Sequence, residues 1–80
     1  MDVNIELADD VKRAVDKCHW TARLRINVSN GGDYIILKGI TSTFYQKQMA
    51  QEAAMAALRQ RNSDVQIRNE IQVEFTNGYF

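Results

Sequence analysis

The most reactive side chains in the sequence belong to Cys18 and His19, which are neighbours in the chain. A thiolate and an imidazole can bind zinc together, or act as a nucleophile and its base. The chain holds 1 cysteine and 1 histidine in all, so a tetrahedral ligand set would be incomplete. Neighbouring helical side chains also diverge by about 100°, and no third group is evident to orient the base. We therefore predict no catalytic residues, no metal site, no cofactor and no enzymatic activity.

A second candidate for chemistry is the loop Asn30-Gly31-Gly32, whose backbone amides could cradle a phosphate. Phosphate-binding loops of this kind join a strand to the start of a helix and carry a longer motif. Here residues 29–33 separate two segments that both have the character of strands, and they tolerate positive φ angles. The loop therefore predicts a β-hairpin.

Length and composition indicate one small globular domain over residues 1–80, with a core of about residues 3–75 and a tail at 76–80. Apolar residues make up 45% of the chain and charged residues 25%, which is ordinary for a folded domain. The 10 basic side chains balance 10 acidic ones, so we expect no nucleic-acid partner. No apolar run approaches the roughly 18 residues of a membrane span, and the acidic N-terminus lacks a signal-peptide pattern.

A first amphipathic helix is predicted from about residue 4 to residue 18. Asp2 or Asn4 can cap its first turn. Asp9 and Arg13, four residues apart, have the order that favours a surface ion pair. Trp20, just after the helix, is interpreted as a lid at the edge of the core. The inward stripe of this helix is Leu7, Ala8, Val11, Ala14, Val15 and Cys18.

A second helix is predicted after Ser42 or Thr43, ending near residue 59 or 60. Thr43 and Gln46 have the spacing of a capping box. Alanine is the best helix former, and its small side chain lets a helix lie close to a sheet. The inward stripe of this helix is Met49 or Ala50, Ala53, Ala54, Ala57 and Leu58.

Two strands are predicted around the glycine-rich loop. Leu24, Ile26 and Val28 alternate with polar residues, which is typical of a half-buried strand. Residues 34–40 are apolar on both parities, which predicts a strand at the centre of a sheet. Gly39 interrupts this run, and we expect it to be a packing position whose bare backbone faces the alanine-rich helix.

The last strand has the clearest alternation in the sequence. Val65, Ile67, Ile71, Val73 and Phe75 share one parity, and the residues between them are polar. Asn69 is a polar residue on the apolar parity. Because a buried unpaired amide is costly, Asn69 is expected to bond to backbone or capping groups and to have a structural role.

The order helix, strand, strand, helix, strand predicts a single α+β domain with a three-stranded mixed sheet. Both helices should pack on one face of the sheet, with a right-handed crossover to the last strand. Parity places Arg25, Lys38 and Arg68 on the opposite face, with Ile36 and Ile40 as an apolar floor. These five residues are the candidate binding face, and the alternative is a solvated sheet face. The same face also receives Arg23, Tyr34, Glu70 and Glu74.

The chain resembles the BON domains, the bacterial osmotic-shock and nodulation domains. That family has a helix, a strand, an apolar-x-Leu-x-Gly strand, an alanine-rich helix and a final apolar-x-Asn-x-apolar-x-Val strand. The matching segments here are Ile35-Ile36-Leu37-Lys38-Gly39 and Ile67-Arg68-Asn69-Glu70-Ile71-Gln72-Val73, within a resemblance over roughly residues 3–75. The sequence departs from the pattern in the hairpin glycines, and in Asn62-Ser63 where a Pro-Gly-like turn is usual.

The resemblance implies a non-enzymatic module that attaches to phospholipid membranes or to proteins of the cell envelope. It implies the periplasm or envelope if a signal peptide has been removed, and the cytoplasm otherwise. The basic side chains of the candidate binding face could meet anionic lipid head groups. The competing interpretation is a structural or self-association domain, in which homo-oligomers pair through the open sheet face or an edge strand.

Overall fold

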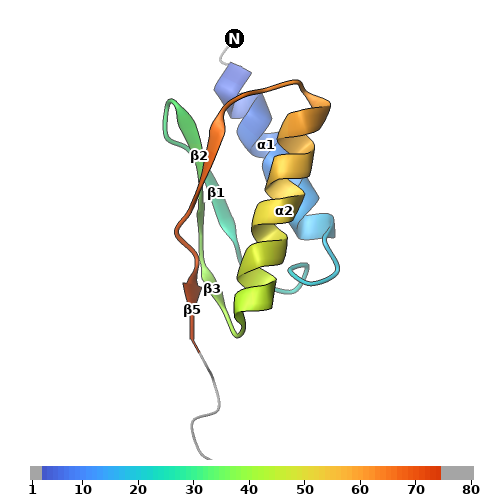
Figure 1. Ribbon diagram of the computed structural model, residues 1–80, viewed down its shortest axis with the longest axis vertical. Helices are drawn as coiled ribbons and strands as arrows, with labels where there is room; N and C mark the ends of the chain where they lie inside the picture. The colour runs from blue at the N-terminus through green and yellow to red at the C-terminus, as the bar shows by residue number, and fades with distance from the viewer. Residues whose placement is uncertain (1–2, 75–80) are drawn as a thin grey trace, which may run out of the picture.

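The computed structural model describes residues 3–74 and confirms the expected α+β architecture (Figure 1). Both helices cover one face of the sheet, on the right in Figure 1, and leave the other face open. The cap expected from Asp2, the strand position of Phe75 and the tail at 76–80 lie outside the described residues, and Asn4 falls within the first helix. In chain order the elements are α1 (Val3–Lys17), β1 (Asn27–Asn30), β2 (Tyr34–Lys38), β3 (Ile40–Thr41), α2 (Phe44–Gln60), β4 (Gln66–Asn69) and β5 (Gln72–Val73).

The sheet has the order β1-β2-β4, with β1 antiparallel and β4 parallel to the central strand β2. β3 and β5 form a separate parallel pair. The two parallel pairs share one register, because Leu37 lies opposite Asn69 and Ile40 lies opposite Gln72. The Gln72 N–H donates to the Gly39 carbonyl (2.9 Å), so hydrogen bonding continues across the gap between the pairs. Each of the two long strands expected from the sequence is thus interrupted once rather than replaced.

The first strand begins later than its alternation pattern predicts. β1 begins at Asn27, and residues 18–24 form consecutive tight turns, in which the Thr21 N–H donates to the Cys18 carbonyl (3.0 Å) and the Leu24 N–H to the Thr21 carbonyl (3.0 Å). Ile26 is nevertheless fully buried and Leu24 half-buried. The pattern therefore identified the inward side chains correctly, although most of the segment has no strand partner.

The hydrophobic core lies between the helices and the inner sheet face. On the last strands the alternation is confirmed, since residues 66, 68, 70, 72 and 74 are all exposed. Two of the three buried side chains of α2 are alanines, so this helix presents mainly small side chains to the core. The buried apolar residues are Leu7, Val11 and Val15 of α1, Ala50, Ala54 and Leu58 of α2, and Ile26, Ile35, Leu37 and Ile71 of the sheet layer.

Gly39 lies between β2 and β3, but its close neighbour is not the one expected. A Cβ added there would stand 2.8 Å from the Arg25 carbonyl oxygen and 3.1 Å from Cδ1 of Ile26. The expectation that Gly39 faces the alanine-rich helix is therefore wrong, because the segment leading into β1 occupies that side. The φ angle of 155° is also one that residues with a Cβ rarely adopt, so glycine is required on two counts.

Asn69 connects the last strand to α2. Its Nδ2 donates to the Lys47 carbonyl (3.1 Å) and to Oε1 of Gln51 (3.2 Å), while its Oδ1 accepts from the Ile71 N–H (3.2 Å). These bonds satisfy the amide as expected for a polar residue on the inward parity. They also give the Ile71 N–H a partner at the interruption between β4 and β5.

The turn and cap chemistry follows the sequence closely, with one correction. The hairpin is closed by a bond from the Gly31 N–H to the Tyr34 carbonyl (2.8 Å). The α2 N-cap is Thr43, whose Oγ1 accepts from the Gln46 N–H (3.0 Å). On α1, however, Arg13 pairs with Asp10 and not with Asp9. Asp10 is the better partner because it is half-buried and also binds the Arg61 guanidinium (2.6 Å).

Candidate functional site

The reactive pair Cys18 and His19 forms no catalytic arrangement in the described part of the chain. Cys18 is half-buried, and the exposed His19 ring contacts the Trp20 ring edge-on, with centroids 5.2 Å apart. Among residues 3–74, no group of three or more His, Cys, Asp or Glu residues is placed to hold a metal ion. Charged and aromatic side chains gather instead on two surfaces of the described residues.

The first surface is the open face of the sheet, here called the sheet face: Tyr34, Ile36, Lys38, Arg68 and Glu70. The Arg68 guanidinium lies 4.9 Å from the centroid of the Tyr34 ring and donates to the Tyr34 hydroxyl (2.8 Å). Glu70 lies between the two bases, 3.3 Å from Arg68 and 3.8 Å from Lys38. Exposed ion pairs of this kind contribute little to stability, but the carboxylate offsets the positive potential of its neighbours.

Four residues of the candidate binding face lie on this side of the sheet, in differing surroundings: Ile36, Lys38, Ile40 and Arg68. Ile36 is half-buried and lies in register between Ser29 and Arg68. Ile40, on β3, is 53% exposed and borders a shallow hollow with Lys38 and Glu70. Arg25 precedes β1 and has no ion pair with another described residue. The structure therefore groups Lys38, Arg68 and Ile40 around an acid, and leaves Arg25 apart from it.

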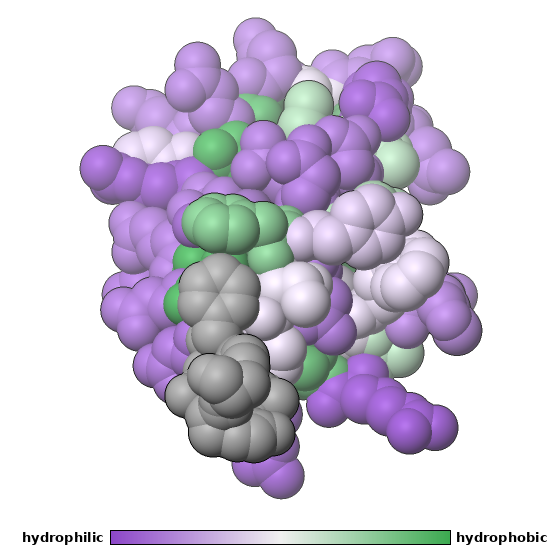
Figure 2. Space-filling view, turned by 60° about the horizontal axis from the view of Figure 1, so that its bottom comes forward, coloured by the Kyte–Doolittle hydropathy of each residue, from purple (hydrophilic) through white to green (hydrophobic). Residues whose placement is uncertain are grey.

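The second surface is one end of the molecule, here called the aromatic end: Trp20, Phe44 and Tyr45, with the bases Lys17, Arg23 and Arg25. The three aromatic side chains are 45%, 68% and 52% exposed, respectively. The Trp20 and Tyr45 rings meet edge-to-face, with centroids 4.8 Å apart. Figure 2 turns this end toward the reader, and green and near-white atoms gather in the middle of the face with purple hydrophilic atoms around them.

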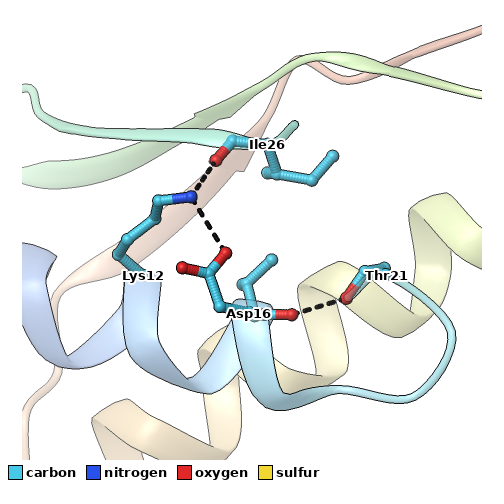
Figure 3. A network of polar contacts seen from close by, with 5 residues as sticks. Lys12, Asp16, Thr21 and Ile26 are labelled. Atoms are coloured by element: carbon cyan, nitrogen blue, oxygen red, sulfur yellow. Dashed lines mark hydrogen bonds and ion pairs between the residues drawn. The ribbon is translucent and has the colours of Figure 1, made fainter. Parts of the chain in front are cut away.

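The loop that carries Trp20 is held against the end of α1. Thr21 is fully buried, and its hydroxyl donates to the Val15 carbonyl (2.7 Å), as Figure 3 shows. The Lys12 ammonium binds both Asp16 (2.9 Å) and the Ile26 carbonyl (3.0 Å), which ties the start of the sheet to the same helix. Turns that point Thr21 inward leave Trp20 directed outward.

The start of α2 supplies the other two rings. Because Thr43 is the N-cap, Phe44 and Tyr45 occupy the first two positions of the helix. Neither residue belongs to the inward stripe, because the first buried residue of α2 is Ala50. The cap thus places the Tyr45 ring against Trp20, with Phe44 next to Tyr45 in the same helical turn.

The bases of the aromatic end are arranged differently from those of the sheet face. Lys17 and Arg23 border the same hollow as Trp20, and the Arg25 backbone lies against Gly39. None of these three bases has an ion pair with another residue in the range 3–74. The acid Glu74 also reaches this end, since its N–H donates to the Thr41 carbonyl (2.8 Å). The local charge therefore stays positive.

Sequence reasoning missed this surface because it treated Trp20 singly, as a lid on the core. The capping box fixes the start of the second helix, and the spacing of its apolar stripe then shows which residues of the first turn face outward. Phe44 and Tyr45 do not fit the stripe that runs through Ala50, Ala54 and Leu58. The contact of Tyr45 with Trp20 depends on the tertiary packing of α1 against α2, and no local pattern encodes it.

No family model, curated protein or solved structure matches this chain. The resemblance to the BON domains therefore remains a prediction from the two strand motifs. Neither of the helices in the described residues is long and apolar enough to cross a membrane.

Proposed function

We propose that this domain is a non-enzymatic module that attaches peripherally to anionic phospholipid membranes. The observation that supports the proposal is the aromatic end, where three exposed rings stand among bases that have no acidic partner in the described residues. The BON resemblance points to the same class of ligand.

The combination suits the boundary between lipid and water. Trp and Tyr are enriched at membrane interfaces, because each has an apolar ring and a polar hydrogen-bonding group. A basic residue close to an anionic membrane contributes about 1 kcal/mol, so Lys17, Arg23 and Arg25 outweigh the single charge of Glu74. Attachment built on so few charges is weak and reversible, and it is screened by salt.

Vesicle flotation tests the proposal directly. The protein should rise with vesicles of phosphatidylglycerol and phosphatidylcholine at low salt. It should stay at the bottom of the gradient with phosphatidylcholine alone, and with the mixed vesicles at high salt. If the folded domain failed to float with the anionic vesicles at low salt, the proposal would be wrong.

Self-association is a second candidate function, and a specific groove favours it. β4 is an outer strand of the sheet, and the groove between its free side and α2 is lined by Met55, Leu58, Val65 and Ile67. A second copy that paired with this edge would cover Met55, which is 37% exposed. Sedimentation over a range of concentrations should then show a dimer that Met55→Lys dissociates. A monomer at every concentration would dismiss this function.

A further inference from the structure

We infer that the aromatic end is the membrane-contacting surface, and that Trp20, Phe44 and Tyr45 enter the head-group region while the sheet face stays in water. The inference rests on the proposed attachment to anionic membranes and adds the part of the molecule that makes contact and its orientation.

Two rings of the aromatic end, Trp20 and Tyr45, are held by the segments that carry them. Trp20 follows α1 on a turn that the buried Thr21 holds through its bond to the Val15 carbonyl (2.7 Å). Tyr45 lies in the first turn of α2, which Thr43 caps. The edge-to-face contact of Trp20 with Tyr45 (4.8 Å) joins these two independently anchored segments. A surface ordered in advance loses less conformational entropy when it binds.

The positive charge of the aromatic end favours a lipid surface over a protein surface of mixed charge. Lys17 and Arg23 border the hollow that Trp20 also lines, so the bases stand beside the ring that would enter the membrane. A ring set among bases that have no ion pair within residues 3–74 suits an anionic interface, where the head groups are negative and the region below them is apolar. On the sheet face, by contrast, Glu70 lies within 4 Å of both Lys38 and Arg68 and would face the same lipids.

Contact through the aromatic end also defines how the molecule is oriented on the membrane. The strands run along the length of the molecule, and the aromatic end lies at the bottom of Figure 1, where α2 begins and β3 and β5 lie. Contact through that end places the long axis of the molecule perpendicular to the membrane surface rather than parallel to it. The sheet face then extends away from the lipid, together with the hairpin at its far end.

The chain contains 1 tryptophan, so the emission of Trp20 reports on its own environment without any substitution. On phosphatidylglycerol–phosphatidylcholine vesicles the emission should shift to shorter wavelength, and lipids brominated on the acyl chain should quench it. Quenching should be strongest with bromine near the head group, because an interfacial ring lies shallow. Vesicles of phosphatidylcholine alone should give neither effect.

A pair of variants assigns the contact to the aromatic end. Phe44→Ser with Tyr45→Ser keeps the tryptophan and removes two exposed rings, and vesicle partitioning should fall on the order of tenfold or more. Tyr34→Ser is the matched control, because it removes an aromatic ring from the sheet face at the start of β2, away from this end, and its partitioning should be unchanged. Circular dichroism melting checks that both variants fold.

The outcomes separate this inference from the proposed function. Flotation with anionic vesicles, combined with unshifted and unquenched emission, would overturn the inference and leave the attachment in place. A folded double variant that floats as well as the wild type would overturn it too. Absence of flotation by the wild type would remove the proposed function, and this inference with it.

Discussion

The sheet face and the aromatic end carry the same kinds of residue but differ in how the bases are paired. Lys38 and Arg68 share one acid, Glu70, because neighbouring parallel strands place these side chains side by side. Arg23 and Arg25 stand in the turns and the extended segment before β1, and neither forms an ion pair with another described residue. Whether a base on a sheet can bind an anion depends on its neighbours on the sheet as well as on its outward parity, because an adjacent acid offsets its charge.

The largest effect is expected where the two surfaces meet, at Gly39. Gly39→Val adds branched atoms at a position where even a Cβ would lie 2.8 Å from the Arg25 carbonyl oxygen, at a φ of 155°. Overpacking and backbone strain together should lower the free energy of unfolding by about 2–4 kcal/mol. Urea unfolding measures the loss. Gly32→Ala is the control, because its φ of 89° is strained but no atom lies within 4 Å of the added Cβ. Equal losses for the two variants would show that the close approach at Gly39 has no energetic weight.

The next effect concerns the charges of the two surfaces. Changing Lys17, Arg23 and Arg25 together to Ser should weaken partitioning to anionic vesicles by about 100-fold, at about 1 kcal/mol for each base. Changing Lys38 and Arg68 to Ser should weaken it by less than about fivefold, since Glu70 already offsets them. Co-sedimentation with vesicles measures both. The reverse ranking would identify the sheet face as the contact surface.

A smaller effect tests the support of the aromatic end. Thr21→Val keeps the shape of the fully buried side chain but removes the hydroxyl that donates to Val15. We expect a loss of about 1 kcal/mol in stability, or about 4–8 °C in melting temperature. Vesicle partitioning should weaken in parallel, because the turn that presents Trp20 loosens. Normal partitioning with lowered stability would show that the turn does not position the ring.

The smallest effect would make the two surfaces more alike. Glu70→Gln removes the acid between Lys38 and Arg68, so the sheet face should gain affinity for anionic vesicles of up to about fivefold. Stability should change by no more than about 0.5 kcal/mol, because the ion pairs are exposed. Decreased partitioning of this variant would show that Glu70 does not offset the charges of Lys38 and Arg68.

The features predicted correctly from the sequence are those that a single segment encodes. The alternation around Ile67 and Ile71 gives the inward parity of the last strands, and the stripe through Ala50, Ala54 and Leu58 gives the inner side of α2. The capping box at Thr43 marks the start of α2 because its bonds are local.

The features that were missed depend on contacts between segments. The interruption at Gly39 reflects the approach of Arg25 and Ile26 from another part of the chain. For four residues of the candidate binding face, Ile36, Lys38, Ile40 and Arg68, parity predicted the side of the sheet. The exposure of Trp20 beside Tyr45 was not predictable, because it requires two helices to be docked first.

The single register of the two parallel pairs has a consequence for the order of folding. β1 and β2 are joined by a short turn, whereas β4 and β5 meet their partners only after the whole of α2 has been crossed. Closing that long segment costs more conformational entropy than closing the hairpin and is therefore slower. The last strands should join late and open first. In native-state hydrogen exchange the amides of Glu70 and Gln72 should then lose protection before those of β1, and the opposite order would contradict this pathway. The strand pairing that completes the sheet is therefore also the part of the sheet that is expected to open first.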